Sequence, residues 1–396
     1  MNLLISSSSP ADKGSGINAY VNQIAAGFVG RGHKVHYLAP APSSLDWLDA
    51  MGIRHVPHCN TADPFVSCKA IHRYILGNKI DGIINNDNAF LQSLAPIVPC
   101  TFVSVGHMSR TSVATLANHQ HRWVDYIVTI SQDMQRRFCN RFGAPLNRLP
   151  IVYNGVTDPG PVKSKAKMPD GRLHVVFSGG MDRNKGAYLL ADSLRSRREL
   201  QDLVQISWFG EIAGGLKQTL AGLACVDLKG RVPRSEFLAV LSDADVLLLP
   251  SFAEGCPMVM LEAMSYGVIP IASNGAGAMQ RLVISGQEGF ICDLRDWAAE
   301  MAACLMQLHG NSSLLTRFSQ AAYARFRSDF TVDNTLDQLE FLLRTPVVDR
   351  SCLPGEIDIL RWHRPLLPGT NRAPLIDRFC IRAGILRGAG RMSITV

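Results

Sequence analysis

The chain has 396 residues, of which 47% are hydrophobic and 18% charged, and its formal net charge is +7. This length and composition predict a soluble globular protein with two domains. No apolar run approaches the roughly 20 residues that span a bilayer, and the start of the chain lacks the basic flank of a signal peptide. The ten cysteines are scattered with no C-x-x-C pair, which argues against a zinc site or a disulfide framework and favours a reducing cytoplasm.

The basic charge is unevenly distributed. Residues 1–160 contain no glutamate, and the last 37 residues carry seven arginines against one acid. No basic run is interleaved with aromatic residues, and no helix-turn-helix or zinc-finger spacing occurs, so nucleic acid is not an expected partner. Contact with an anionic membrane surface is one interpretation of this charge, and ordinary solvated charge is the other.

Strand-like and helix-like segments alternate along the N-terminal half. The predicted strands there are Leu3–Ser6, Lys34–Ala39, Asp81–Asn85, Thr101–Val105, Asp125–Ile130 and Leu149–Tyr153. Between the first two strands, residues 17–28 follow helical spacing, and residues 30–33 mark the end of that helix. Such alternation predicts a parallel sheet with right-handed crossovers.

A linker rich in proline, glycine and lysine follows at residues 158–171, and the alternation then restarts. The predicted strands are Leu173–Ser178, Val204–Phe209, Val226–Lys229, Val246–Leu249, Val268–Ala272 and Gly289–Cys292. The expected fold is therefore α/β, with two Rossmann-like doubly wound domains, residues 1–160 and 161–345, facing a central cleft. Residues 346–396 form a basic, proline-rich extension that either packs back on the N-terminal domain or is partly disordered.

The most informative stretch is residues 251–264, which follows an apolar run at 245–250. Pro257 suits the first position of a helix, which places Glu254 in a loop at the carboxyl end of a strand and Glu262 on the helix. Gly255 permits close backbone approach, and free helix N–H groups point at whatever binds there. Two carboxylates framing such donors suit a hydroxyl-rich ligand with a phosphate nearby, such as a nucleotide sugar. The alternative is a helix N-terminus with two surface acids.

This Glu-x7-Glu element, with its loop, proline and helix, resembles that of retaining GT-B glycosyltransferases, especially those of family 4. The resemblance implies that Glu254 contacts the hydroxyls of the donor sugar and that Glu262 contacts the ribose of the nucleotide. It covers roughly residues 1–340, and its motifs are more specific in the C-terminal half. It implies a GT-B fold with the acceptor side in the N-terminal domain and the donor side in the C-terminal domain.

A second signal is the loop at residues 177–186, which follows the first strand of the second domain and opens a helix. Its glycines allow close backbone approach, and its cations can neutralise a diphosphate. Lys185 and Gly186 match the family loop, whereas Gly180 occupies the position of the family arginine. The resemblance implies that Lys185 contacts the leaving diphosphate, with Arg183 as a candidate substitute for the missing arginine. A solvated cationic turn is the alternative.

Further segments resemble the family more loosely. Residues 13–18, which include Gly16, resemble its first loop, whose backbone amides face the donor phosphate. His107 stands at a strand end where the family often has a histidine near the reacting carbon of the donor sugar; a structural histidine is the alternative. Residues 229–232 resemble the segment whose backbone holds the base. The turn at residues 275–281 keeps the family's glycines but lacks its acid.

The resemblance therefore implies a retaining hexosyltransferase that moves a sugar from a UDP- or GDP-linked donor to a hydroxyl of a saccharide or lipid-linked acceptor. Bacterial surface polysaccharide, lipopolysaccharide or glycolipid assembly is the expected setting, in the cytoplasm or at the inner face of the membrane. Because the leaving phosphate helps take the acceptor proton in the family's front-face mechanism, no nucleophile, metal or other cofactor is expected. The alternatives are a sugar-nucleotide epimerase or phosphorylase on the same fold, and a non-catalytic nucleotide-sugar-binding subunit.

Two sets of residues follow from this interpretation. The predicted catalytic residues are His107, Lys185 and Glu254. The predicted donor-binding residues are Gly16, Arg183, Arg231, Val232, Gly255, Cys256, Pro257, Met258 and Glu262. No metal ligand is predicted.

Overall fold

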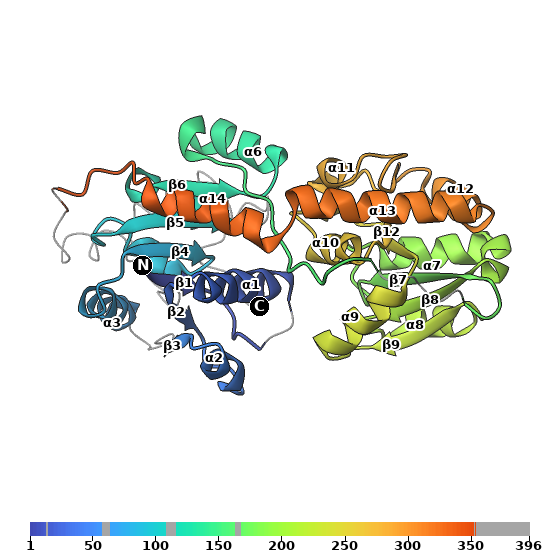
Figure 1. Ribbon diagram of the computed structural model, residues 1–396, viewed down its shortest axis with the longest axis horizontal. Helices are drawn as coiled ribbons and strands as arrows, with labels where there is room; N and C mark the ends of the chain where they lie inside the picture. The colour runs from blue at the N-terminus through green and yellow to red at the C-terminus, as the bar shows by residue number, and fades with distance from the viewer. Residues whose placement is uncertain (13–14, 58–63, 108–115, 163–167, 352, 354–396) are drawn as a thin grey trace. The chain divides into compact units, whose positions relative to one another are not determined.

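The computed structural model describes residues 1–12, 15–57, 64–107, 116–162, 168–351 and 353. The chain divides into two compact units (Figure 1). The N-terminal unit contains Met1–Asn154 and the described residues from Val332 onward, and the C-terminal unit contains Gly155–Thr331. Each unit is an α/β layer structure of its own, as the alternating sequence pattern predicts.

A six-stranded parallel sheet forms the centre of the N-terminal unit, in the order β3-β2-β1-β4-β5-β6. Its strands are β1 (Asn2–Ser6), β2 (Lys34–Ala39), β3 (Arg54–Pro57), β4 (Gly82–Asn86), β5 (Thr101–Gly106) and β6 (Tyr126–Thr129). Every residue of β4, β5 and β6 is buried, as expected for a parallel sheet covered on both faces. The predicted strands agree with this sheet except at β3, which was not predicted, and at residues 149–153.

The predicted strand Leu149–Tyr153 is wrong. Only Ile151 forms a bridge, to Thr129 at the end of β6. The segment still runs beside β6, because Thr129 donates to the Pro150 carbonyl and Val152 donates to the Thr129 carbonyl, both at 2.9 Å. Pro150 has no N–H to offer a ladder, which explains why the apolar run does not become a regular strand.

Helices cover this sheet. They are α1 (Gly16–Gly30), α2 (Asp46–Ala50), α3 (Pro64–Gly77), α4 (Ala89–Ser93), α6 (Gln132–Phe142) and α14 (Val332–Arg344), with 3-10 turns at His121–Trp123 and Leu146–Arg148. Helix α1 begins where predicted, because the Ser15 hydroxyl accepts a hydrogen bond from the Asn18 N–H at 3.2 Å.

Helix α14 belongs to the N-terminal unit, although the sequence placed its residues in the second domain. It packs against α1 and β5 (Figure 1). Arg31 at the end of α1 pairs with Asp333 at 3.0 Å and Asp337 at 2.6 Å. Helix α14 therefore returns the chain to the first unit, which no local pattern reveals.

The first residues of the C-terminal extension are also bound to the N-terminal unit. Asp125, which is fully buried, accepts hydrogen bonds from the N–H groups of Val347 and Val348, each at 2.9 Å. Arg350 completes the contact with an ion pair to Asp125 at 2.7 Å. The predictions for residues 354–396 lie outside the described residues.

A second six-stranded parallel sheet forms the centre of the C-terminal unit, in the order β14-β12-β10-β7-β8-β9. Its strands are β7 (Leu173–Ser178), β8 (Val204–Phe209), β9 (Val226–Gly230), β10 (Val246–Leu249), β12 (Ile269–Ser273) and β14 (Phe290–Cys292). All six strands were predicted to within a residue or so. A short pair, β11 (Ala253–Glu254) and β13 (Ala276–Gly277), was not predicted.

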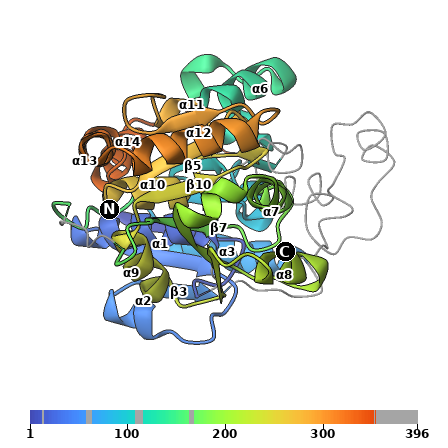
Figure 2. The same ribbon diagram turned by 90° about the vertical axis from the view of Figure 1, so that its right-hand side faces the viewer.

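The helices of this unit pack on both faces of the sheet. They are α7 (Ala187–Ser196), α8 (Gly214–Ala221), α9 (Arg234–Asp243), α10 (Met258–Ser265), α11 (Met279–Leu282), α12 (Trp297–His309) and α13 (Ser312–Asp329), with a 3-10 segment at Arg198–Asp202. Helix α10 packs beside β10 and against α13 (Figure 2). The core includes Trp208 and Trp297, both fully buried.

Both sheets reverse their strand order at one position. The first strand of each unit has its sequence successor on one side and the fourth strand on the other, which places β1 beside β4 and β7 beside β10. In open α/β sheets, ligands bind outside the carboxyl ends of the strands at such a point. Gly16 follows β1, Lys185 follows β7 and Glu254 follows β10, so these predicted site residues come after strands at the reversal points. His107 and Arg231 instead follow β5 and β9.

Candidate functional site

The two main site loops of the C-terminal unit are tied to each other at the carboxyl ends of β7 and β10. Phe252 donates its N–H to the Asn184 carbonyl at 2.8 Å. The Asn184 side-chain amide donates to the Ala253 carbonyl at 3.0 Å. The loop predicted to bind phosphate and the loop that carries Glu254 therefore form one connected surface.

Lys185 and Glu254, both predicted to be catalytic, are in direct contact. Lys185 Nζ lies 2.6 Å from Glu254 Oε1, and the Ser251 hydroxyl donates to the same oxygen at 2.8 Å. The Glu254 side chain is 8% exposed and that of Lys185 is 33% exposed. The carboxylate is thus held in place by two donors, while the ammonium group remains accessible to an anion.

The glycine-rich turn after β12 supports Glu254 from behind. Glu254 pairs with Gly277 in the short β11–β13 ladder. Gly277 has φ +123, and a Cβ there would lie 1.5 Å from the Glu254 carbonyl oxygen. Only glycine fits at this approach, which explains why this turn keeps its glycines even though it lacks the family acid.

Gly180 also has a structural reason to be glycine. Its φ is +54, and a Cβ there would lie 2.7 Å from the Glu211 carbonyl oxygen and 2.9 Å from the Glu211 nitrogen. Its N–H donates to the Phe209 carbonyl at 2.8 Å, and its carbonyl accepts from the Trp208 indole at 2.9 Å. The backbone of this chain has no room for the family arginine at this position.

Arg183 lies in the same loop and contacts an aromatic ring. Its guanidinium carbon lies 4.3 Å from the centroid of the Tyr188 ring on α7. Such a cation–π contact is one of the ordinary ways to hold an exposed arginine. The role of Arg183 as a substitute phosphate ligand stays a prediction.

Glu262 forms a second ion pair, which the sequence analysis missed. Arg234 Nη2, at the start of α9, lies 2.6 Å from Glu262 Oε1 on α10. The Glu262 side chain is 6% exposed, whereas that of Arg234 is 48% exposed. The residue pair is 28 positions apart in sequence, and no short motif connects its members. Helix α10 begins at Met258 with Pro257 at its N-cap, one residue later than predicted.

The remaining predicted donor-binding residues of this unit have the following contacts. Arg231 and Val232 follow β9, and Arg231 lies 4.0 Å from Glu211 in an exposed pair that contributes little. Gly255 accepts a hydrogen bond from the Ala278 N–H at 3.1 Å. Cys256 is buried.

His107 of the N-terminal unit is buried directly after β5. It is 5% exposed, and its Nε2 lies 2.9 Å from Asn86 Oδ1. The Asn86 amide nitrogen donates to the Ser6 carbonyl, so its oxygen faces the imidazole and Nε2 must carry the proton. Burial lowers the pKa of His107 to about 4, and the ring is therefore neutral at physiological pH.

Asp87, which follows β4 at the point of strand reversal, is a candidate site residue that the sequence analysis missed. It has φ +55, a left-handed conformation that is uncommon outside glycine. Its Oδ1 atom is shielded from solvent and has no hydrogen-bond partner among the described residues. Burial raises the pKa of Asp87 to about 7. The available sequence signal was its place, since an acid directly after the fourth strand faces the expected ligand edge.

The first loop is only partly described. Gly16 is the first residue of α1, and Lys13 and Gly14 lie outside the described residues. Nearby, the Ser7 and Ser9 hydroxyls donate to Asn18 Oδ1 at 3.0 and 2.8 Å. Polar groups thus line the carboxyl end of β1, as the predicted site requires.

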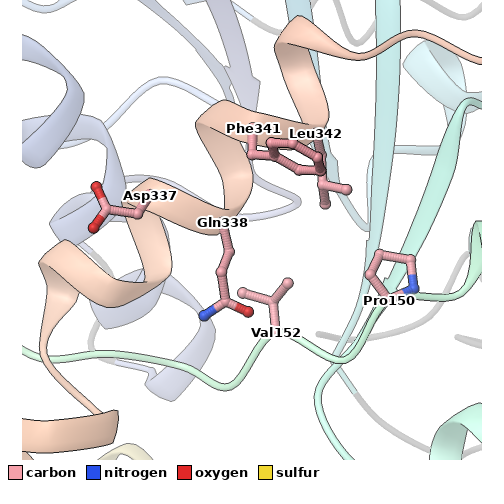
Figure 3. A pocket seen from close by; sticks show the side chains of 6 residues that line it. All are labelled: Pro150, Val152, Asp337, Gln338, Phe341 and Leu342. Carbon is pink, nitrogen blue, oxygen red and sulfur yellow. The ribbon is translucent and has the colours of Figure 1, made fainter.

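An apolar hollow of about 350 Å³ lies elsewhere in the N-terminal unit. Figure 3 shows Phe341, Leu342 and Gln338 of α14 around it, with Pro150 and Val152 on the other side. None of the predicted site residues line it, so it is separate from the chemistry proposed here. In the described residues, no group of three or more His, Cys, Asp or Glu side chains could hold a metal ion. Among the helices described, none has both the length and the hydropathy to cross a membrane.

Each unit matches a protein-family model. Residues 14–158 match the model described as Glycosyltransferase Family 4, and residues 172–311 match the model described as Glycosyl transferases group 1. The N-terminal unit is therefore similar to the family 4 glycosyltransferases, and the C-terminal unit to the glycosyl transferases of group 1. The GT-B fold agrees, because a glycosyltransferase from Rickettsia africae, with 16% identity, superposes with a TM-score of 0.70 over 87% of this chain and 98% of its own.

Individual glycosyltransferases are also similar to this chain. Anabaena HepE in complex with UDP-glucose has a TM-score of 0.69 at 18% identity, covering 87% of this chain and 99% of its own. A glycogen synthase of Mycobacterium tuberculosis is 28% identical over 214 residues, or 52% of this chain and 50% of that protein. A D-inositol 3-phosphate glycosyltransferase of Pseudarthrobacter chlorophenolicus is 28% identical over 45% of this chain and 48% of that protein. This chain therefore spans about half the length of the curated relatives it matches.

Proposed function

We propose that this protein is a retaining glycosyltransferase that transfers a hexose from a nucleoside-diphosphate sugar to an acceptor hydroxyl. The observation that carries the proposal is the Lys185–Glu254 pair at the carboxyl ends of β7 and β10, in a chain matched by family models in both units. A cation beside a hydroxyl-binding carboxylate is the arrangement that a sugar diphosphate requires.

In the proposed reaction, the bond between the anomeric carbon and the diphosphate oxygen breaks. The acceptor oxygen forms a new bond to the same face of that carbon, and its proton passes to the leaving phosphate. Lys185 stabilises the negative charge that develops on the diphosphate, and Glu254 holds the sugar hydroxyls. His107 of the N-terminal unit keeps its proposed catalytic role as a neutral imidazole.

The donor is proposed to be UDP- or GDP-linked, with Glu262 on the ribose and the backbone at residues 231–232 on the base. The complex of Anabaena HepE with UDP-glucose supports a UDP-glucose type of donor. The acceptor is proposed to be a saccharide or a lipid-linked saccharide in polysaccharide assembly. Relatives named for amylovoran biosynthesis in Erwinia amylovora and colanic acid biosynthesis in Salmonella typhimurium support this setting. Peripheral contact with the inner face of the membrane remains part of the proposal.

The direct test begins with ligand binding. Thermal unfolding is followed with UDP, GDP and their glucose, galactose and mannose conjugates, since a bound ligand raises Tm by mass action. A donor that stabilises the protein is then assayed for transfer to candidate acceptors, with the anomeric configuration of the product determined by NMR. A product with inverted configuration, or no stabilisation by any nucleotide, contradicts the proposal.

Metal independence is a separate part of the proposal. Lys185 and the helix N–H groups can supply the electrostatic stabilisation that a divalent ion gives elsewhere. Transfer should therefore persist after exhaustive chelation with EDTA. Complete loss of activity that magnesium or manganese restores would show that a metal is required.

A non-catalytic nucleotide-sugar-binding subunit is the second candidate, and Gly180 is the observation that favours it. The backbone excludes the family arginine at this position, so Lys185 is left as the family-matched cation of the loop. Nucleotide-sugar binding without turnover across acceptors would support this candidate. Isomerisation of the donor without an acceptor would instead indicate an epimerase.

A further inference from the structure

The ion pair between Arg234 and Glu262 joins the first residue of α9 to the middle of α10, and the two helices pack against each other. Arg234 is the first residue of α9, Glu262 lies on α10, and the two helices are in contact. The carboxylate is almost fully buried, whereas the arginine remains half exposed. Arg234 therefore reaches inward from solvent to an acid that the fold has enclosed.

A buried carboxylate is costly unless a cation or several donors satisfy it. Arg234 is the one side chain in the described residues that donates to the Glu262 carboxylate, and it uses one oxygen, Oε1, at 2.6 Å. The other oxygen, Oε2, has no hydrogen-bond partner among those residues. The carboxylate is thus charge-compensated on one side and free to accept on the other.

The pKa of Tyr266 is affected by both charges of this ion pair. Burial raises the pKa of Tyr266, the negative charge of Glu262 raises it further, and the positive charge of Arg234 lowers it. Both charges therefore act on the same spot at the end of α10.

We propose that Arg234 is a positioning residue for the ribose of the donor nucleotide. By holding Oε1, it turns Glu262 so that Oε2 accepts the ribose hydroxyls, and it makes the site select ribonucleotides over 2′-deoxyribonucleotides. This inference rests on the proposed function, because it assigns a role within the same nucleotide site. A ribose diol supplies the donors that the free oxygen lacks, and a 2′-deoxyribose supplies one fewer.

The test compares Arg234→Gln and Arg234→Lys with the wild-type protein. Affinities for UDP, GDP, 2′-deoxy-UDP and 2′-deoxy-GDP are measured by calorimetry. Arg234→Gln should weaken ribonucleotide binding about 10-fold while changing 2′-deoxynucleotide binding little, so that the preference for ribose collapses. Arg234→Lys should restore part of that preference. In turnover, KM for the donor should rise with kcat nearly unchanged.

Arg195→Gln is the control, since Arg195 is an exposed arginine on α7 of the same unit with an exposed partner, Asp192. It should leave all four affinities unchanged. The Arg234→Gln change is also made in a Glu262→Gln background, where it should have no further effect on ribonucleotide binding.

Equal losses for ribo- and deoxyribonucleotides, or the same loss in the Glu262→Gln background, would overturn the inference and make Arg234 a structural residue of α9. If the wild-type protein binds UDP and GDP but the Arg234 variants show no change, this inference alone fails. If the wild-type protein binds neither nucleotide, the proposed function fails and the inference fails with it.

Discussion

The two units treat the polar groups at their strand ends in opposite ways. In the C-terminal unit, the two predicted site acids each have a cation beside them, Glu254 with Lys185 and Glu262 with Arg234. In the N-terminal unit, His107 is buried as a neutral ring, and Asp87 has an oxygen without a partner in the described chain. Ion pairs therefore stabilise the charged residues of the proposed donor side, whereas burial shifts the pKa values of residues on the proposed acceptor side.

This difference has a chemical meaning. An ion pair fixes the position of a charge that must meet another charged or hydroxyl-rich group. A group that is buried without an opposite charge beside it has a shifted pKa, so its protonation state depends on pH around that shifted value. We therefore expect the transfer rate to fall when a charge is removed from the donor side. On the acceptor side, we expect the free energy of unfolding to depend on pH.

The largest effect should come from removing the donor-side cation. Lys185→Ala takes away the positive charge beside Glu254, so the rate of transfer should fall by about 1,000-fold while the protein stays folded. The measurement is kcat/KM with the stabilising donor, together with Tm. Lys217→Ala, an exposed lysine on α8, is the control and should keep the wild-type rate. Full activity of Lys185→Ala would reduce the loop to a solvated turn.

On the acceptor side, the shifted pKa of His107 should make the free energy of unfolding depend on pH. The pKa of His107 is about 4 in the folded chain against 6.5 as the reference value. Between these values the unfolded chain binds a proton that the folded chain does not, so the free energy of unfolding falls as pH drops from 6.5 to 4. The total for His107 is about 3 kcal/mol.

Asp87 should act with the opposite sign. Its pKa is about 7 in the folded chain against 3.8 as the reference value, so the folded chain holds an extra proton between them. The free energy of unfolding from this group therefore falls as pH rises from about 4 to 7. The two contributions offset each other in the wild-type protein over most of this range.

Two variants separate these contributions. Asp87→Asn leaves the His107 contribution, so the protein should be more stable at pH 7 than at pH 5 by a wider margin than the wild type. His107→Asn leaves the Asp87 contribution and should shift that difference the other way. Urea denaturation at the two pH values measures both, with His309→Asn at the exposed end of α12 as the control. Shifts of the same sign in both variants would contradict the comparison.

Gly180 tests whether the donor side tolerates a side chain where the family has one. Gly180→Ala places a Cβ against the backbone of Glu211 at a positive φ, so it should cost about 1–3 kcal/mol of stability. Gly180→Arg should destabilise the protein similarly and should not raise the rate of transfer. Thermal unfolding and kcat/KM measure the two effects. A stable, faster Gly180→Arg variant would mean that the loop can adopt the family conformation.

The smallest expected effects separate the two acids of the donor side. Glu254→Gln should lower kcat by about 10-fold, because sugar contacts tighten in the transition state. Glu262→Gln should instead raise KM for the donor, because the ribose is bound equally in the ground and transition states. Steady-state kinetics with the same donor compares them. If both variants behave like the wild type, the Glu-x7-Glu assignment is wrong.

The sequence by itself determined the fold class and the donor-side motifs. Parallel strands buried on both faces appear as apolar runs, so almost every strand of the two sheets could be predicted. The Glu254 loop and the Lys185 loop were recognised because each lies within one short stretch that follows one strand. The strand ends that carry them are fixed by local order along the chain.

Tertiary structure decided which of these residues meet. Arg234 reaches Glu262 from another helix, and α14 returns to the N-terminal unit through Arg31, contacts that have no local pattern. The space that excludes a side chain at Gly180 comes from the neighbouring loop at Glu211. Asp87 became a candidate only through its burial and its unpaired oxygen. Burial, pairing and close approach depend on groups distant in sequence, so they become visible only when the chain is folded.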